Sequence, residues 1–163
     1  MTTKPKRVVR LDPMTEAEYA GWVTESIAGY ADAQVEAGLW DRETAEQRSR
    51  DEFQQLLPHG LATAGHHLWT ARDAETDAEA GILWIAVRPK GAEIEAYVYD
   101  VLVNPEVQGL GYGRAVMDAG AVAARELGAQ TVALNVHGHN ERAYSLYKSL
   151  GYVVTNRRMQ LGL

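Results

Sequence analysis

The feature that most constrains the fold is the stretch from Val98 to Gly120, VYDVLVNPEVQGLGYGRAVMDAG. An apolar, β-branched run ends at Asn104-Pro105, and glycines follow at alternate positions 109, 111 and 113. The apolar residues after them recur at helical spacing. A strand followed by a bare turn and a helix start brings unpaired backbone N–H groups to the positive end of a helix dipole. This pattern is typical of a phosphate-binding site.

Two common phosphate motifs do not match this turn. A P-loop requires Gly-Lys-Ser/Thr, whereas this chain has Arg114 and Ala115 after Gly113. A dinucleotide fingerprint requires a Gly or Ala at its sixth position, which is Arg114 when counted from Gly109. The turn also comes late in the chain, after several predicted strands. The phosphate ligand is therefore of another kind.

The rest of the chain alternates helical and extended patterns, separated by turn residues. The sequence TEAE at Thr15 has the form of a capping box, and Asp41 suits the start of a second helix. We expect strands at residues 8–11, 67–71, 81–87, 94–103 and 131–136, helices from 15, from 41, over 111–127 and over 140–150, and a closing hairpin of residues 152–155 and 158–161. This order predicts one domain over residues 1–163, with an α/β (α+β) mixed sheet and helices on both faces.

The composition excludes several classes of site. The chain has no cysteine, which removes disulfides, thiolate nucleophiles and cysteine-based zinc sites. Its net charge is -6, with 16 Lys and Arg against 22 Asp and Glu, so we expect no nucleic-acid partner. Two histidine pairs, at 66–67 and at 137 and 139, have no obvious third ligand, and we expect no metal. The absence of cysteine fits a reducing cytosol, so we expect a cytoplasmic protein. No run approaches the roughly 18 apolar residues that span a membrane, so we expect no membrane partner.

Two motifs resemble those of the GNAT superfamily of N-acetyltransferases. Gln108-x-x-Gly111-x-Gly113 is similar to that family's Q/R-x-x-G-x-G/A signature, and it follows VLVNPE, which resembles the end of the family's fourth strand. Further along, NVHGHNERAYSLYKSLGYVV resembles the second motif of the family. The positions that match this second motif are Asn140, Ala143, Leu146, Tyr147, Gly151 and Tyr152. The resemblance is clear over residues 81–154.

The resemblance implies the GNAT acyl-CoA N-acyltransferase fold. Its central sheet is mostly antiparallel and splayed between the fourth and fifth strands, with helices on both faces. It also implies acetyl-CoA as co-substrate and direct transfer of the acetyl group to an amine. The absence of cysteine argues independently against a cysteine acyl-enzyme.

The same resemblance implies a donor site along the fourth strand and the turn. The pantetheine arm would pair with residues 101–103, where an N–H near Leu102 or Val103 would polarise the thioester carbonyl. The backbone from Gly109 to Arg114 would surround the pyrophosphate. Asn140 would steady the pantetheine or a water, although it also suits a helix cap. The cofactor-binding residues expected on this basis are Val101, Leu102, Val103, Gln108, Gly109, Leu110, Gly111, Tyr112, Gly113, Arg114, Asn140 and Tyr147.

The resemblance makes Tyr147 the general acid that protonates the departing CoA thiolate. A lone tyrosine on this apolar helix face would otherwise be a core residue. The base is open, because tyrosines stand at 97 and 99, where some family members have an acidic residue or histidine. Glu95 and Asp100 are candidates. Alternation along the strand places Glu95, Tyr97 and Tyr99 on one face and Asp100 on the opposite face, unless a bulge moves Asp100 to the same face. A water chain held by the tyrosines is a further alternative, and an amine that arrives deprotonated would need no dedicated base.

Tyr30, Trp84, Tyr97 and Tyr99 are expected to line the acceptor pocket, although Trp22, Tyr30 and Trp84 also suit a core. The acidic composition favours a cationic amine, either a small molecule or a protein lysine or N-terminus. A non-catalytic acyl-CoA sensor on the same fold is the alternative function, since no base is evident. Another acceptor atom or a longer acyl group stays open, as does a homodimer, which the family often forms.

Overall fold

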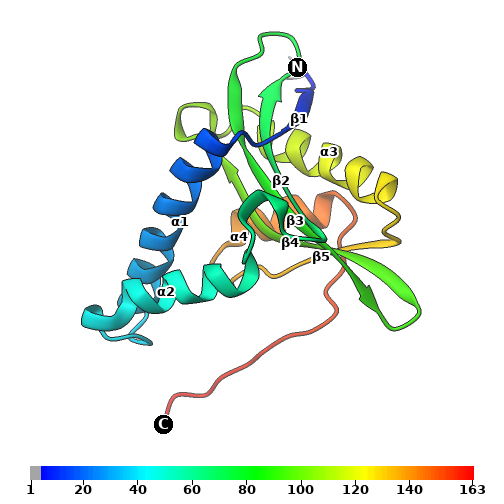
Figure 1. The fold of residues 1–163 in the computed structure, drawn as a ribbon. Coiled ribbons are helices and arrows are strands. Elements are labelled where there is room, and N and C mark those ends of the chain that lie inside the picture. The colour runs from blue at the N-terminus through cyan, green and yellow to red at the C-terminus, as the bar shows by residue number, and fades with distance from the viewer. Residues whose placement is uncertain (1–4) are drawn as a thin grey trace. The chain divides into compact units, whose positions relative to one another are not determined.

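The computed structural model describes residues 5–163 (Figure 1). The chain forms two compact units, one ending at Ala133 and the other beginning at Leu134. The prediction of one domain over residues 1–163 stays a prediction. In chain order the elements are β1 (Val9–Pro13), α1 (Glu16–Glu36), α2 (Arg42–Leu56), the short 3-10 helix η1 (Gly60–Ala62), β2 (His66–Asp73), β3 (Glu79–Lys90), β4 (Glu93–Val103), the 3-10 helix η2 (Pro105–Val107), α3 (Tyr112–Glu126), β5 (Thr131–Leu134) and α4 (Glu141–Ser149).

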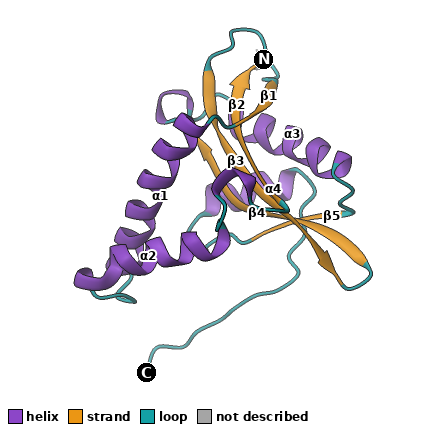
Figure 2. Ribbon diagram, in the orientation of Figure 1, coloured by secondary structure: helices purple, strands orange, loops and turns teal. Residues whose placement is uncertain are grey.

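The strands form one five-stranded sheet in the order β1-β2-β3-β4-β5 (Figure 2). The first four strands pair antiparallel in chain order, and β5 lies parallel to β4. Short turns suffice for the antiparallel pairs, whereas the parallel pair needs a crossover, which α3 provides. The predicted fold class, a mostly antiparallel mixed sheet of the GNAT type, is confirmed.

The two faces of the sheet carry different helices, as predicted. On one face, Ile82 and Trp84 of β3 pack in a buried cluster with Trp22 of α1. On the other, a Cβ added to Gly120 of α3 would lie 2.7 Å from Leu83 Cδ2. Successive side chains of a strand point to opposite faces, so this alternation along β3 separates the α1 and α2 side from the α3 side.

The first two helices begin where the sequence indicates. Thr15 and Glu18 form the predicted capping box, with each side chain accepting a hydrogen bond from the other residue's backbone N–H. Asp41 caps α2 by accepting from the N–H of Glu43. The Ser49 hydroxyl is buried and donates to the Ile27 carbonyl over 2.8 Å, which fastens α2 to α1.

Within the unit that begins at Leu134, α4 is the one helix. Asn140 caps it by accepting from the N–H of Ala143, and Gly151 follows its end with φ of 95°. Two sequence predictions were wrong here. The strand from Thr131 ends at Leu134 rather than at 136, and residues 152–163 carry no strand where a closing hairpin was expected. Two four-residue strands without a primed-turn sequence between them have little stability of their own.

No helix within residues 5–163 has both the length and the apolar character needed to cross a membrane.

Candidate active site

The turn between β4 and α3 has the backbone that its glycines predict. Gly109 and Gly111 adopt φ of 77° and 96°, which an L side chain rarely adopts. Gly111 is the N-cap of α3, and its carbonyl accepts the first helical hydrogen bond, from Ala115. The amide groups of the first helical turn therefore begin directly after a residue without a side chain, which suits an anion at the helix start.

The side chain of Tyr112 has a structural role. The Tyr112 hydroxyl donates to Asp73 Oδ2 over 2.5 Å, and Tyr112 is only 7% exposed. Asp73 also accepts from the N–H groups of Glu75 and Thr76, and the Tyr112 hydrogen bond is the main cause that lowers the pKa of Asp73 to about 2. This network ties the start of α3 to the turn after β2. What Tyr112 can offer a ligand is its backbone.

The end of β4 presents backbone groups on its outer edge. The N–H of Asn104 donates to Ala80 on β3, so by alternation Leu102 also points its backbone groups at β3. Val101 and Val103 therefore point theirs away from β3. Consistent with this, the Gln108 side chain donates to the Val103 carbonyl over 3.1 Å. Of the two N–H groups considered for the thioester, that of Val103 faces the outer edge.

β5 is too short to cover that edge as a strand. The N–H of Gln130 donates to Ile94 over 2.8 Å, so β5 begins beside the start of β4. Four residues extend only about 13 Å, against about 36 Å for the eleven of β4. The pairing with β5 thus belongs to the first part of β4, and the segment 101–103 lies beyond it.

A β-bulge decides which side chains of β4 face α1. Trp84 pairs with Asp100 but Ile85 pairs with Val98, so Tyr99 is the extra residue. Residues that pair across an antiparallel ladder share a face. Asp100 therefore lies on the same face as Trp84, as the sequence analysis allowed for if a bulge were present. The ring of Tyr99 stacks on Trp84 with centroids 4.7 Å apart.

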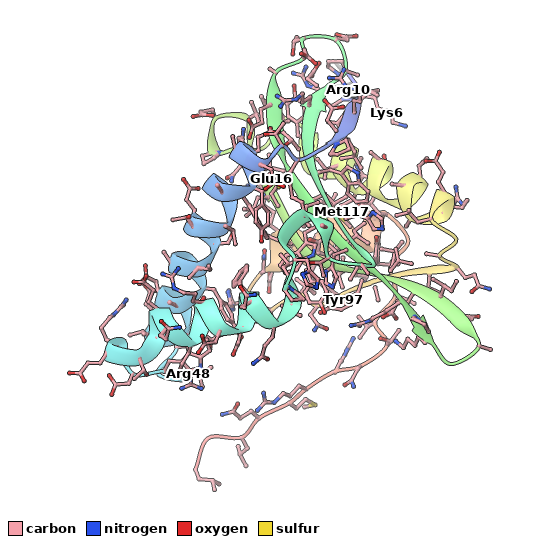
Figure 3. The ribbon with its side chains drawn as sticks, viewed as in Figure 1. Lys6, Arg10, Glu16, Arg48, Tyr97 and Met117 are labelled. Atoms are coloured by element: carbon pink, nitrogen blue, oxygen red, sulfur yellow. The ribbon has the colours of Figure 1, made fainter. Side chains whose placement is uncertain are left out.

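On this face lies a pocket of about 630 Å³, within the usual range for small-molecule sites. The sheet contributes Trp84, Tyr99, Asp100 and Leu102. From α1 come Trp22, Glu25, Ser26, Gly29 and Tyr30, and from α2 come Glu52, Phe53 and Leu56. Three of the four residues expected at the acceptor site are thus brought together. The fourth, Tyr97, which Figure 3 labels, is outside the lining. The Arg88 Cζ atom lies 4.4 Å from the centroid of the Tyr97 ring.

Asp100 is the carboxylate at the sheet end of the pocket. Trp22 Nε1 donates to its Oδ2 over 3.1 Å. Burial raises the pKa of Asp100, and this outweighs the lowering by the hydrogen bonds from Trp22 and the Val101 backbone. A carboxylate with a raised pKa is a better proton acceptor than an ordinary one.

Glu95, the other candidate base, has a different environment. It is 3% exposed and forms ion pairs with Arg88 at 3.1 Å and Lys90 at 2.7 Å. The hydrogen bond from Lys90 is the main cause that lowers the pKa of Glu95. A carboxylate with a lowered pKa is a weaker base, and Glu95 is not among the pocket residues. These contacts favour Asp100 for this role.

Glu25 and Glu52 are pocket residues that the sequence analysis did not single out. The Glu52 side chain hydrogen-bonds Tyr30, and burial together with this carboxylate raises the pKa of the Tyr30 hydroxyl. Trp22, Glu25, Ser26, Gly29 and Tyr30 recur at helical spacing, which could have indicated one shared face. Nothing local indicates that α2 closes the same pocket.

Tyr147 and Asn140 belong to α4 and its cap. Within that unit, the rings of Tyr147 and Tyr152 have centroids 5.7 Å apart, and Asn140 performs the capping role noted above. Their expected roles in binding or catalysis stay predictions.

The comparisons with known proteins agree with this architecture. The model of the acetyltransferase (GNAT) family matches residues 22–152. The chain belongs to the GNAT acetyltransferase family. It is 36% identical over 148 residues to the "Uncharacterized N-acetyltransferase YycN" of Bacillus subtilis, covering 91% of this chain and 94% of that protein. The crystal structure of YycN superposes with a TM-score of 0.85 at 35% identity, over 96% of this chain and 99% of that one.

A partial relative has a more specific name. The chain is 37% identical over 89 residues to the mycothiol acetyltransferase of Propionibacterium freudenreichii, over 55% of this chain and 28% of that protein. The protein is an enzyme of the GNAT acyltransferase type, and members of this family generally use an acyl-CoA.

Proposed function

We propose that this GNAT enzyme transfers an acetyl group from acetyl-CoA to a primary amine bound in the pocket between α1, α2 and β4. One observation carries the proposal. Asp100 and Leu102 line the pocket, while the intervening residue Val101 and its neighbour Val103 present backbone groups on the outer edge of the same strand. An amine in the pocket and a thioester along the edge would therefore meet at one short segment of β4.

The donor would be held mainly by backbone. The pantetheine arm would pair with the outer edge at 101–103, and the Val103 N–H would polarise the thioester carbonyl. The pyrophosphate would lie at the start of α3, where the glycines allow close approach. The side chain of Arg114, in the first turn of α3, would add a positive charge near the pyrophosphate.

The reaction would form one bond and break another. The neutral amine nitrogen attacks the thioester carbonyl, a C–N bond forms, and the C–S bond breaks to release CoA. The proton lost from the nitrogen passes to Asp100, directly or through water. Tyr147 donates its hydroxyl proton to the leaving thiolate, a role that rests on the sequence motif. Bulk water then restores both groups.

The test combines binding and turnover. Calorimetry with acetyl-CoA should show micromolar binding by the wild type and a loss of at least about tenfold in Gly111→Glu, because a carboxylate would repel the pyrophosphate. Gly128→Glu is the matched control. Gly128 has φ of 89° at the opposite end of α3, with open space around a Cβ, so this variant introduces similar backbone strain away from the turn. Equal binding by both variants would remove the turn from the donor site.

Turnover is measured as CoA release over a panel of primary amines. We expect acetylation of at least one amine, and a fall in kcat of about a hundredfold or more in Tyr147→Phe, which lacks the proton donor. A Tyr147→Phe variant with the wild-type rate would contradict the acid assignment. Tight acetyl-CoA binding without release of CoA for any amine would contradict the proposed reaction and support a regulatory acyl-CoA-binding role instead.

A further inference from the structure

The charged side chains that line the acceptor pocket all have one sign. Three carboxylates, Asp100, Glu25 and Glu52, belong to its lining. Within the described part of the chain, residues 5–163, no Lys, Arg or His side chain contributes to this lining. One negative group suffices to accept the proton of the reacting amine. The two glutamates are therefore available for a second task.

The three carboxylates come from opposite sides of the pocket. Asp100 lies on the sheet and contacts the indole of Trp22, whereas Glu25 and Glu52 lie on α1 and α2 and are exposed. Glu25 is about 5 Å further along α1 than Trp22, and Tyr30, the hydrogen-bond partner of Glu52, is about 12 Å further. A ligand that reaches from Asp100 to the glutamates is consequently elongated along α1.

Aromatic rings line the space between these two ends. Phe53 lies edge-on to Trp22 at 6.1 Å between centroids and to Tyr30 at 6.4 Å. Such walls suit methylene groups and also the face of a cation. Tyr30 remains 37% exposed, so a cation beside it would keep part of its hydration.

We propose that the acceptor is a small diamine, with one amino group beside Asp100 and a second, positively charged group held by Glu25 and Glu52. The two nitrogens are separated by about four to eight carbon atoms, since each carbon of an extended chain adds ~1.3 Å. This inference rests on the proposed function, because it assigns the acetylated nitrogen to the Asp100 end. The rest of the chain lies along the rings of Trp22 and Phe53.

The experiment compares α,ω-diaminoalkanes with n-alkylamines of the same chain length, with acetyl-CoA as donor. We expect the wild type to prefer the diamine in kcat/KM by about tenfold, most strongly at spacers of four to eight carbons, and added salt to reduce this preference. The double variant Glu25→Gln, Glu52→Gln should lose most of the preference. Glu36→Gln is the matched control, since Glu36 is exposed at the end of α1 outside the pocket and should retain it.

The outcomes separate the two proposals. Equal rates for diamines and alkylamines, or a preference that survives in the double variant, would overturn the diamine assignment and leave the acetyltransferase reaction standing. A lysine peptide acetylated faster than every diamine would also overturn it. If acetyl-CoA binds but neither amine series releases CoA, the proposed function falls, and the diamine assignment falls with it.

Discussion

The two faces of the sheet are covered in contrasting ways. On the α3 face, small residues allow close contact, with Gly120 against Leu83 and Ala115 and Ala124 buried. On the α1 and α2 face, aromatic rings surround a pocket of about 630 Å³. The difference corresponds to two proposed tasks. A donor held by backbone needs a helix that is close and rigidly placed, whereas an acceptor needs space that side chains can shape.

The largest effect should come from the carboxylate on the pocket side. Asp100→Asn keeps the size of the side chain but removes the proposed base, so we expect kcat/KM for the amine to fall by about a hundredfold at pH 7. Acetyl-CoA affinity, measured by calorimetry, should change little, because the donor is proposed to bind on the outer edge. A decrease in kcat/KM of less than about threefold would contradict the role of Asp100 as base. The proton would then be taken up by water, or the amine would bind already deprotonated.

Two glycines, one in a helix on each face, compare the packing directly. A Cβ on Gly120 would lie 2.7 Å from the buried Leu83, whereas one on Gly29 would have nothing within 4 Å. Gly120→Ala should therefore lower the free energy of unfolding by about 1 kcal/mol, since overpacking outweighs the gain in helix propensity. Gly29→Ala should raise it by about 0.5–1 kcal/mol. Urea denaturation measures both, and effects of the same sign would contradict the contrast between the faces.

The smallest effect concerns the hydrogen bond from Trp22 to Asp100. That bond stabilises the carboxylate and partly offsets the burial that raises the pKa of Asp100. In Trp22→Phe the pKa of Asp100 should rise further, so the rise of kcat/KM with pH should move to higher pH, with the plateau rate less affected. A pH–rate profile gives the result. If kcat/KM of Trp22→Phe rose over the same pH range as that of the wild type, a group other than Asp100 would control this rise.

Local sequence accounts for much of the proposed donor site and for much less of the proposed acceptor pocket. The glycines at 109 and 111 have the positive φ that their pattern predicts, and the caps at Thr15, Asp41 and Asn140 form as expected. Each of these depends on residues within a few positions of one another. Glu25 and Glu52 were not singled out, because they share a pocket only after α1 and α2 have packed on the sheet.

The sequence by itself determined the order of the main elements from β1 to α4, the glycine-rich turn before α3 and the family to which the chain belongs. The tertiary structure decided which face Asp100 occupies, because a bulge at Tyr99 is set by pairing with β3. It also decided that Glu95 forms ion pairs with Arg88 and Lys90, since both of these residues lie on the neighbouring strand β3. Turns and caps are local, so sequence specifies them directly. The register, the ion pairs and the pocket depend on contacts between distant segments, which exist only once the chain has folded.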